Sequence, residues 1–593
     1  MRKPGPRGMS PEKILSIINV ALGKEKADLV LTNAKLVNVY TGEIQPDYCV
    51  AVKHDRIAYV GKNASHTIGP DTRVLDIPGK TIIPGFIDAH THMLAVINPA
   101  EYIKAAMLHG TTTIITEIQE ITFPLGYRGA LFFLNYLKDQ PIKVFCTIPP
   151  LLTMSRSVEK NFLTLQQFHR LLKRDEVMGL GEPYWLPTIK GDKRVLEFIS
   201  ETSYAGKRME GHASGARNEK LVAYFSTGIT SCHESVSKEE TLEKLRLGVS
   251  TMVREGGNRT ELPAIADIQK EKIDLRLLSL VSDGLSAEIL YKKGYMDHIV
   301  RQAIRYGFNP VTAIQAATIN PATHFALDDI LGGIAPGRYA DILVVPDIEN
   351  IDAEYVISKG KVVADKGHLT AEPRKTNWPV FIRRSILMPK LFTPEDFRIK
   401  AKIQNGRARV RVIEQIAELV TKELVTDVQV SAGSVQVDTE RDIIKVAAIS
   451  RVEEPGKTAL GLIKGFGLKK GAFASSASWD CGSIVAVGVD DGDLALAINR
   501  ISELHGGCIV CCEGKILAEV DLTVGGSMST LPLKELHEGL QKIQQVVAGL
   551  GNKLNRAHLS LVVLSTGAIP HLRITETGLY NIRENAYVDL FVD

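Results

Sequence analysis

The sequence predicts an α/β protein in which a (β/α)8 TIM-like barrel is inserted in a small β-sandwich domain and followed by a C-terminal α/β domain. Two observations predict the barrel. Short apolar runs alternate with helical intervals over about 240 residues, the usual size of such a barrel, and histidines or carboxylates follow several runs, where barrel chemistry gathers. A third observation predicts the insertion: β-like runs flank this region on both sides.

Eight apolar runs are the candidate barrel strands, and their alternation with helical segments indicates parallel βα units. These runs are Ile82–Asp88, Thr111–Thr116, Lys143–Ile148, Val177–Glu182, Arg208–His212, Ile229–His233, Ser250–Arg254 and Leu275–Asp283. Helices are expected between them, for example over Pro99–Leu108, Leu165–Leu172 and Lys238–Leu247.

The remaining elements divide the 593 residues further, as expected for a chain of this length. Ser10 as N-cap and Pro11 at the first helical position predict a leading helix. The β-like runs between Ala27 and Pro78 are completed by runs about 280 residues later. The predicted domains are a helical segment (1–26), the small β-domain (27–80 and 331–372), the barrel (81–330), a linker (373–406) and the C-terminal domain (407–593).

The C-terminal domain is expected to combine strands with an amphipathic helix. Its strand-like runs include Ile443–Ile449, Ile484–Val489 and Leu559–Leu564. The helix presents Leu533, Leu536, Leu540, Ile543, Val547 and Leu550 on one face.

Composition excludes several classes of protein. Hydrophobic residues make up 45% of the chain and the formal net charge is +3, which describes a globular protein without the basic footprint of nucleic-acid binding. No apolar stretch is long enough to span a membrane, and no signal peptide is recognisable, so a cytoplasmic protein is expected. The group Cys508, Cys511 and Cys512 lies in an apolar run and is expected to hold buried, reduced thiols.

The strongest functional signal is the stretch Pro84-Gly85-Phe86-Ile87-Asp88-Ala89-His90-Thr91-His92. The apolar run Thr81–Ile87 is interpreted as a buried strand, and two histidines follow at its end. Residues i and i+2 of a strand point to the same side, so His90 and His92 can present two imidazoles to one ion. This stretch predicts a metal site.

Further ligand-type residues end other predicted strands. They are Glu182, His212, His233 and Asp283. Imidazoles and carboxylates suit one or two divalent metals. Each residue alone has an ordinary structural interpretation, such as a core imidazole or a helix cap, but their shared position at strand ends favours one metal centre.

With these residues in place, the sequence resembles the amidohydrolase superfamily and, within it, the adenine deaminase family, over nearly the whole chain. Besides the His90/His92 stretch, the shared motifs are Leu180-Gly181-Glu182, Gly211-His212, Gly228–Glu234, Leu242–Gly248, Val253–Gly256, Ser282-Asp283, Ala317–Ala322, Ile334–Gly337 and Lys470–Ser476. The last motif lies in a domain that resembles one peculiar to adenine deaminases, so the resemblance is family-specific.

The resemblance implies a barrel with a binuclear metal centre. Its ligands would be His90, His92, Glu182, His212 and His233, with Glu182 where many relatives carry a bridging carbamylated lysine. It also implies two divalent ions, Mn²⁺ or Fe²⁺, although Zn²⁺ suits the same ligand types. A small purine substrate and a homodimer or larger assembly are implied as well.

The reaction implied by the resemblance is hydrolysis of adenine to hypoxanthine and ammonia, a step of purine salvage. Two metal ions lower the pKa of a bridging water and deliver hydroxide at neutral pH. Asp283 is placed to take the proton and pass it to the departing amine. Glu120 matches an acidic position of the family and is expected to protonate the ring or contact a metal, with a solvated loop carboxylate as the alternative.

The sequence departs from the family pattern at three places. Glu117-Ile118-Gln119-Glu120-Ile121 stands where the family has Asp-Pro-His-Glu-Ile, Trp479-Asp480-Cys481-Gly482-Ser483 where it has a pattern close to His-Asp-Ser-His-Asn, and Gly284 replaces the second residue of a double aspartate. Two alternatives therefore stay open: an amidohydrolase of the same fold that acts on another cyclic amidine, amide or lactam, and a non-catalytic metabolite-binding paralogue. Substrate-binding residues are not predicted.

Overall fold

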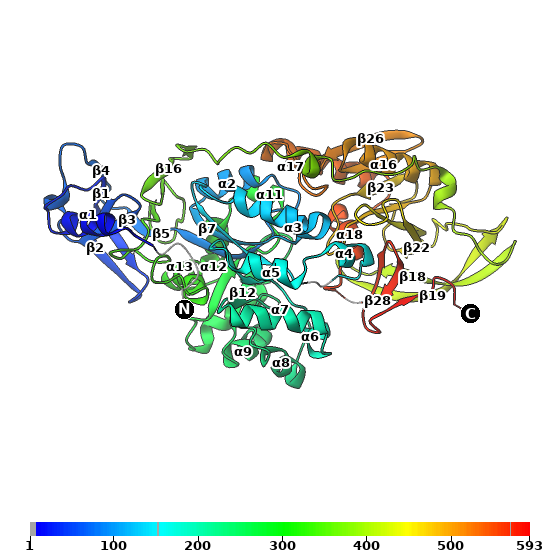
Figure 1. Cartoon of the computed structure of the whole chain (residues 1–593), viewed down its shortest axis with the longest axis horizontal. Helices are drawn as coiled ribbons and strands as arrows, with labels where there is room; N and C mark the ends of the chain where they lie inside the picture. Colours follow the sequence, from blue (N-terminus) through cyan, green and yellow to red (C-terminus); the bar gives the residue numbers. More distant parts are fainter. Residues whose placement is uncertain (1–7, 151–152, 570, 593) are drawn as a thin grey trace.

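The computed structural model describes residues 8–150, 153–569 and 571–592. Figure 1 shows three regions along the long axis of the molecule: a β-rich region with the N-terminal helix at one end, parallel strands surrounded by helices in the centre, and a second large sheet with its own helices at the other end. No helix in these described ranges is both long and apolar enough to cross a membrane.

The N-terminal helix α1 (Pro11–Ala21) begins at the predicted residue. The Ser10 side chain accepts a hydrogen bond from the Lys13 backbone N–H, and Pro11 occupies the first turn, where its missing N–H costs nothing. Ile17 and Val20 are buried together with residues of the adjoining sheet, including Ala51. The helix therefore covers one face of that sheet.

One nine-stranded mixed sheet contains strands from both predicted halves of the small β-domain. Its strands are β1 (Leu29–Asn38), β2 (Glu43–Lys53), β3 (Arg56–Gly61), β4 (Arg73–Asp76), β5 (Thr81–Pro84), β14 (Ile342–Val345), β15 (Tyr355–Ser358), β16 (Lys361–Asp365) and β17 (His368–Leu369). The order is β17-β16-β15-β14-β5-β1-β2-β3, and β4 also pairs with β1. Side chains of β1, β2, β14 and β15 share one hydrophobic cluster, so the sheet curls around a common core.

The apolar run Thr81–Ile87 forms parts of two strands, whereas the sequence predicted a single strand. It breaks at Gly85 into β5, which belongs to the nine-stranded sheet, and β6 (Phe86–Thr91), which begins the parallel strands. A Cβ atom at Gly85 would lie 2.3 Å from Oγ1 of Thr112, so only glycine fits where the chain passes between the two sheets. Periodicity could not reveal this break because both strands are fully buried.

All eight predicted parallel strands are present, arranged as two sheets. Besides β6, they are β7 (Thr111–Glu117), β8 (Lys143–Ile148), β9 (Val177–Leu180), β10 (Arg208–Met209), β11 (Ser231–Cys232), β12 (Ser250–Arg254) and β13 (Leu278–Val281). The first sheet has the order β10-β9-β8-β7-β6 and the second β11-β12-β13. The predicted strands were too long at several carboxyl ends, where the chain leaves the sheet to form the site.

Backbone hydrogen bonds join the two parallel sheets at both edges. Asp283 donates to the carbonyl of His90 and accepts from the N–H of His92, both at 2.9 Å, and Thr230 donates to the carbonyl of Met209 at 3.1 Å. Inward-facing side chains of β6, β7, β8, β9, β12 and β13 form one cluster. Strands from both sheets therefore enclose a shared core.

Helices surround these strands, as Figure 1 shows. The predicted helices appear as α2 (Pro99–Leu108), α5 (Leu165–Leu172) and α9 (Lys238–Arg246). The others are α3 (Gln119–Tyr136), α4 (Arg156–Asn161), α6 (Trp185–Ile189), α7 (Lys193–Tyr204), α8 (Asn218–Phe225), α10 (Leu262–Ile265), α11 (Ala287–Lys292), α12 (Met296–Arg305), α13 (Pro310–Ala316) and α14 (Ile319–His324).

The C-terminal region contains a second nine-stranded sheet, of order β20-β19-β18-β22-β21-β24-β23-β25-β26, and a three-stranded one, β27-β28-β29. The strands are β18 (Gly406–Gln415), β19 (Thr421–Ser431), β20 (Ser434–Val435), β21 (Ile443–Ser450), β22 (Thr458–Lys464), β23 (Ala472–Ser475), β24 (Ser483–Gly488), β25 (Gly507–Cys512), β26 (Lys515–Asp521), β27 (Leu572–Thr575), β28 (Gly578–Asn581) and β29 (Ala586–Val588). Its helices are α16 (Asp491–Leu504), α17 (Leu533–Gly549) and α18 (Ala557–Val562).

Two predictions for this region have opposite outcomes. The amphipathic helix is confirmed as α17, which buries Leu536, Ile543 and Val547. The run Leu559–Leu564 is not a strand: it forms the end of α18 and a turn of 3-10 helix. A short apolar run carries no usable period, and its burial is equally compatible with a helix.

The segment expected as a linker, 373–406, is not merely a surface loop. It contains the short helix α15 (Val380–Arg383), and Ile382, Ile386 and Phe397 are fully buried. The predicted domain boundaries themselves stay a prediction.

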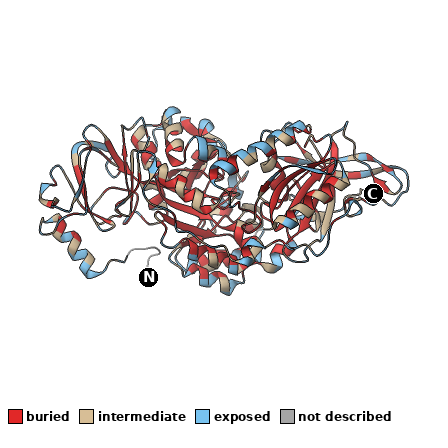
Figure 2. Ribbon diagram, turned by 90° about the horizontal axis from the view of Figure 1, so that it is seen from above, coloured by how far each residue is buried: buried red, intermediate tan, exposed pale blue. Residues whose placement is uncertain are grey.

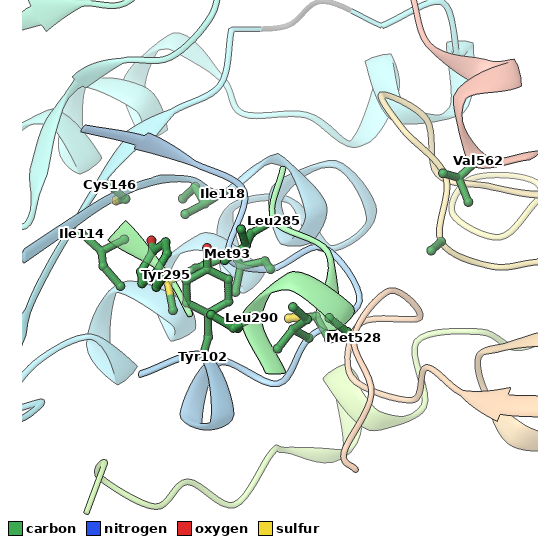
Figure 3. Packing of buried hydrophobic residues seen from close by; sticks show 14 of the residues in the cluster. Met93, Tyr102, Ile114, Ile118, Cys146, Leu285, Leu290, Tyr295, Met528 and Val562 are labelled. Carbon is green, nitrogen blue, oxygen red and sulfur yellow. The ribbon is translucent and has the colours of Figure 1, made fainter. Parts of the chain in front are cut away.

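The C-terminal region packs tightly on the central one. Figure 2 shows that buried residues fill the strands of both regions, and one hydrophobic cluster extends through both. Figure 3 shows Met528 of the C-terminal region in the same cluster as Met93 and Leu290. Val96 also exchanges backbone hydrogen bonds with Ser527 and Ser529, at 3.1 and 2.8 Å. These contacts fix a C-terminal wall above the carboxyl ends of the parallel strands.

Candidate metal centre

The six residues predicted for the metal site and its base come together at the carboxyl ends of five parallel strands. They are His90 and His92 at β6, Glu182 after β9, His212 after β10, His233 after β11 and Asp283 after β13. Five of these residues are buried, and Asp283 is only slightly exposed. Because parallel strands end at the same edge, residues far apart in sequence meet here.

Glu182 divides its two carboxylate oxygens between two pairs of imidazoles. Oε1 lies 3.2 Å from Nε2 of His90 and 3.1 Å from Nε2 of His92. Oε2 lies 2.9 Å from Nδ1 of His212 and 3.4 Å from Nε2 of His233. A carboxylate placed between two imidazole pairs has the geometry of a ligand that bridges two ions.

Asp283 faces the first imidazole pair. Its Oδ1 lies 3.6 Å from Nε2 of His90 and 3.5 Å from Nε2 of His92. Its backbone has a φ of 55°, in the left-handed region that non-glycine residues seldom adopt. The two backbone hydrogen bonds to His90 and His92 hold this conformation, so the carboxylate is fixed against both imidazoles.

The side chains fit divalent metal ions. Nε2 of His90 is buried without a hydrogen-bond partner among the described residues, an arrangement that costs free energy unless an ion binds there. Ligand atoms lie within 4.8 Å of one another in three groups: His90, Glu182 and His233; His90, His92 and Asp283; and His212, His233 and Glu234. The donors are nitrogens and carboxylate oxygens, as divalent transition metals require.

Electrostatics in the cluster favour positive charge. Burial lowers the pKa of His90, but the charges of Glu182 and Asp283 outweigh burial and raise it to about 10. For His233, burial and the charge of His90 lower the pKa to about 4. At His92 and His212 as well, neighbouring carboxylates outweigh burial and raise the pKa. The carboxylates thus stabilise positive charge beside them, and divalent ions would satisfy the same carboxylates.

Arg254 keeps Asp283 ionised, and the sequence analysis gave it no role. It ends β12, is 1% exposed, and donates from Nη1 to Oδ2 of Asp283 at 3.2 Å. It also pairs with Glu234 and, through two bonds of 3.1 and 2.9 Å, with Glu261. Burial raises the pKa of Asp283, but its contact with the His90 imidazole and the charge of Arg254 lower it well below its usual range. The sequence signal that could have indicated Arg254 is a charged residue at the end of an apolar strand.

Glu117 is a second residue that sequence reasoning missed. It ends β7, is 1% exposed, and accepts a hydrogen bond from Oγ1 of Thr147 at 2.7 Å. Burial and the charge of Glu182 raise its pKa to about 8. A Cβ atom at Gly181 would lie 2.4 Å from Oε2 of Glu117, so this carboxyl packs directly against the chain that carries Glu182.

Glu120 lies in the first turn of α3 and contacts the cluster. Its Oε1 is 2.9 Å from Nδ1 of His92, and its Oε2 is buried without a partner in the described structure. The side chain is 10% exposed, which does not fit the alternative of a solvated loop carboxylate. Gln119, next to it, is 8% exposed.

The Trp479–Ser483 segment reaches the cluster from the C-terminal region. It lies between β23 and β24, and the Trp479 ring centroid is 5.1 Å from that of His92. Trp479 lines two cavities. One, of about 70 Å³, is also lined by His92, Glu182, His212, His233 and Asp283, and the other, of about 460 Å³, lies between the two regions. Gln119 and Glu120 line the larger cavity. Two departures from the family pattern therefore lie beside the site.

Comparisons with known proteins agree with this geometry. Residues 81–363 match the model of the amidohydrolase family, and residues 418–586 match the adenine deaminase C-terminal domain. A protein of Moorella thermoacetica named adenine deaminase is 36% identical over 97% of this chain and 97% of its own length. This chain belongs to the adenine deaminase family. A Clostridium botulinum member, also named adenine deaminase, is 35% identical over 98% of this chain and 97% of its own.

Among solved structures, phenylurea hydrolase B is 17% identical over 59% of this chain and all of its own, with a TM-score of 0.45. The family assignment does not depend on that structure. It depends on the near full-length relatives, whose similarity extends from the parallel strands through the C-terminal region.

Proposed function

We propose that this protein hydrolyses adenine to hypoxanthine and ammonia at a centre of two divalent metal ions. One observation carries the proposal: Glu182 divides its carboxylate between two imidazole pairs, in a chain that is similar over nearly its whole length to proteins named adenine deaminase.

Two sets of side chains would hold the ions. His90, His92 and Asp283 with Oε1 of Glu182 form one set, and His212 and His233 with Oε2 of Glu182 form the other. We propose Mn²⁺ or Fe²⁺ as the ions, and Zn²⁺ fits the same donors. When bound, such a pair supplies hydroxide at neutral pH and stabilises charge on the reacting oxygen.

Asp283 is the proposed proton carrier. In the overall reaction, a C–O bond forms at C6 of adenine, the bond from C6 to the amino nitrogen breaks, and a proton of water must reach that nitrogen. Asp283 is ionised because Arg254 and His90 lower its pKa, so it can accept the proton at neutral pH. It then donates the proton to the amino nitrogen, which leaves as ammonia.

Glu120 is the proposed contact to the purine ring. C6 of adenine is a poor electrophile until a ring nitrogen is protonated or hydrogen-bonded. Glu120 uses Oε1 for His92 and leaves Oε2 without a partner in the described structure. Because the residue also lines the larger cavity, the carboxyl in its protonated form can donate a hydrogen bond from that oxygen to a ring nitrogen of the substrate.

A second substrate class is favoured by a specific observation. Trp479 contacts His92 and lines both cavities, and Gln119 lines the larger one, whereas the family pattern has histidines at both positions. Two changed residues beside an intact ligand set are compatible with another cyclic amidine, amide or lactam. The metal chemistry would be the same.

We further propose that the eight parallel strands act as one (β/α)8 barrel. The hydrogen bonds at both sheet edges and the shared inner cluster support it. A role in purine salvage, a homodimeric assembly and a cytoplasmic location complete the proposal, and they derive from the family resemblance.

Hydrolysis of a panel of substrates tests the proposal, measured as ammonia release for the amino-bearing bases and as ring opening for the lactam. The protein is loaded with Mn²⁺ and assayed in turn with adenine, cytosine, guanine and a small lactam. The proposal expects adenine to have the highest kcat/KM by at least about tenfold. Faster turnover of any other member would replace adenine with that compound, and no turnover of any member with two ions bound would support the non-catalytic alternative.

A further inference from the structure

Arg451 is a buried cation that the proposed reaction does not use. It follows β21 in the C-terminal region and lines the 460 Å³ cavity beside the metal centre. Only 5% of the residue is exposed. Burial lowers the pKa of its guanidinium to about 10, so the group still carries its charge at neutral pH.

The guanidinium of Arg451 has a single hydrogen-bond partner in the described structure. Nη1 donates to the carbonyl of Gly525 at 2.8 Å, whereas Nε is buried without an acceptor and Nη2 forms no bond. No described carboxylate lies within the 4.0 Å that defines an ion pair with this group. An unpaired buried charge is costly, and proteins seldom retain one without a function.

The other charged groups that line the cavity each have a partner of their own. These pairs are Glu120 with His92, Glu288 with Lys292, Asp480 with Tyr184 and Arg556 with Glu418. His558 contacts Oγ of Ser475, and burial lowers its pKa to about 4, so it is neutral. Of the two arginines that line this cavity, Arg451 is therefore the one without a carboxylate partner among the described residues.

The cavity offers further hydrogen-bond donors. The side-chain amide of Gln119 and the indole N–H of Trp479 have no partner among the described residues, and both residues line the same cavity as Arg451. The Gly525–Ser527 turn connects Arg451 to the metal centre: Gly525 accepts from Arg451, and Ser527 donates to the carbonyl of Glu120, whose side chain contacts His92.

We propose that this cavity binds a ligand bearing an oxyanion, either a carboxylate or a phosphate group, and that Arg451 is its charge partner. Guanidinium groups bind both oxyanions through paired N–H bonds. Adenine is uncharged, so the proposed reaction alone gives Arg451 no partner. The oxyanion has two sources: a free inorganic anion bound beside the purine, or an anionic substituent of the substrate itself.

The first experiment measures thermal unfolding of the metal-loaded protein in about 10 mM sulfate and in chloride of equal ionic strength. Wild type and an Arg500→Met control, whose arginine pairs with Glu519 outside the cavity, should show the same sulfate-dependent rise in Tm of at least about 2 °C. Arg451→Met should show none. In chloride, Arg451→Met should unfold at the wild-type temperature or above, because an uncompensated charge has been removed.

Two results would overturn this part of the proposal: an equal sulfate response in Arg451→Met, or a Tm for that variant well below wild type in both salts, which would make Arg451 structural. If Arg451→Met fails to fold, Arg451→Lys replaces it. The lysine keeps the charge but loses the planar fork, so the sulfate concentration at half-maximal response should rise about tenfold. An unchanged concentration would contradict the proposal.

The second experiment distinguishes the two sources and rests on the proposed purine substrate. Calorimetric titrations compare 9-(carboxymethyl)adenine with neutral 9-ethyladenine. Binding of the carboxylate at least about tenfold tighter by wild type, with no preference in Arg451→Met, assigns the subsite to a substituent of the substrate. A sulfate response without this preference assigns it to a free anion. If neither response depends on Arg451, the proposal is wrong even where adenine is turned over.

Discussion

The two cavities that share Trp479 divide the site into two halves, which differ in origin and in charge. The half at the strand ends carries the metal-type ligands, and its charged groups are paired through Glu182, Asp283 and Arg254. The C-terminal half brings Trp479 and Arg451 from loops of another region, and it leaves a guanidinium without a carboxylate among the described residues. We propose that the strand-end half carries the chemistry and the C-terminal half selects the ligand, so substitutions in the two halves should fail in different ways.

The largest effect is expected from the bridging position. Replacing Glu182 by Gln removes the charge that both imidazole pairs face, so bound metal should fall below two ions per chain and activity by at least about a thousandfold. Elemental analysis and ammonia release measure both quantities. Glu201→Gln, whose carboxylate contacts only the surface residue His169, should match wild type, and full metal content in Glu182→Gln would contradict a bridging role.

Asp283→Asn should separate proton transfer from metal binding. The amide cannot accept the proton, so kcat should fall by about 10²- to 10⁴-fold, while most of the metal is retained because the imidazoles and Glu182 remain. The measurement is kcat together with metal content, and Asp274→Asn, which alters an exposed partner of Arg276, is the matched control. A kcat within twofold of wild type would remove Asp283 from the proton path.

Asp480 should make the C-terminal half sensitive to pH. Burial raises its pKa from 3.8 to about 6, so between these values the folded chain binds a proton that the unfolded chain releases. Stability from this group is therefore present below about pH 4 and lost as pH rises through 6, by about 3 kcal/mol in total. The urea midpoint of wild type minus that of Asp480→Asn should fall across this window. A difference independent of pH would show that the pKa of Asp480 is the same in the folded and unfolded chains.

Trp479 should give the smallest effect and act on binding. Its indole lies between the two cavities, so Trp479→Ala should raise the KM for adenine by about 2- to 10-fold through lost aromatic contact, with metal content unchanged. Trp479→Phe should recover most of the loss. A larger fall in kcat than in affinity would instead connect the C-terminal half to the chemical step.

The proximity of the side chains at the strand ends could be predicted because spacing determines it. Residues i and i+2 of a strand share a side, and parallel strands end at one edge, so His90, His92 and Asp283 could be brought together before the structure was known. The proximity of these residues follows from local periodicity and the fold class alone.

The remaining features depend on tertiary structure. The break at Gly85 follows from contact with Thr112, and the helical state of Leu559–Leu564 follows from packing that a six-residue apolar run does not reveal. The Arg254 side chain does not bind metal ions, so the pattern of metal-ligand residues does not indicate it. Trp479 was noted as a departure, but only the contact with the ring of His92 shows that its loop reaches the site.

The proposal that two metal ions serve the hydrolysis of adenine is tested most plainly by ammonia release while Mn²⁺ is added stepwise to metal-free protein. His90→Ala/His92→Ala is the control. Turnover should rise until about two ions are bound per chain and should be absent in the control. Undiminished turnover in the control, or no turnover of adenine with two ions bound, would contradict the proposal.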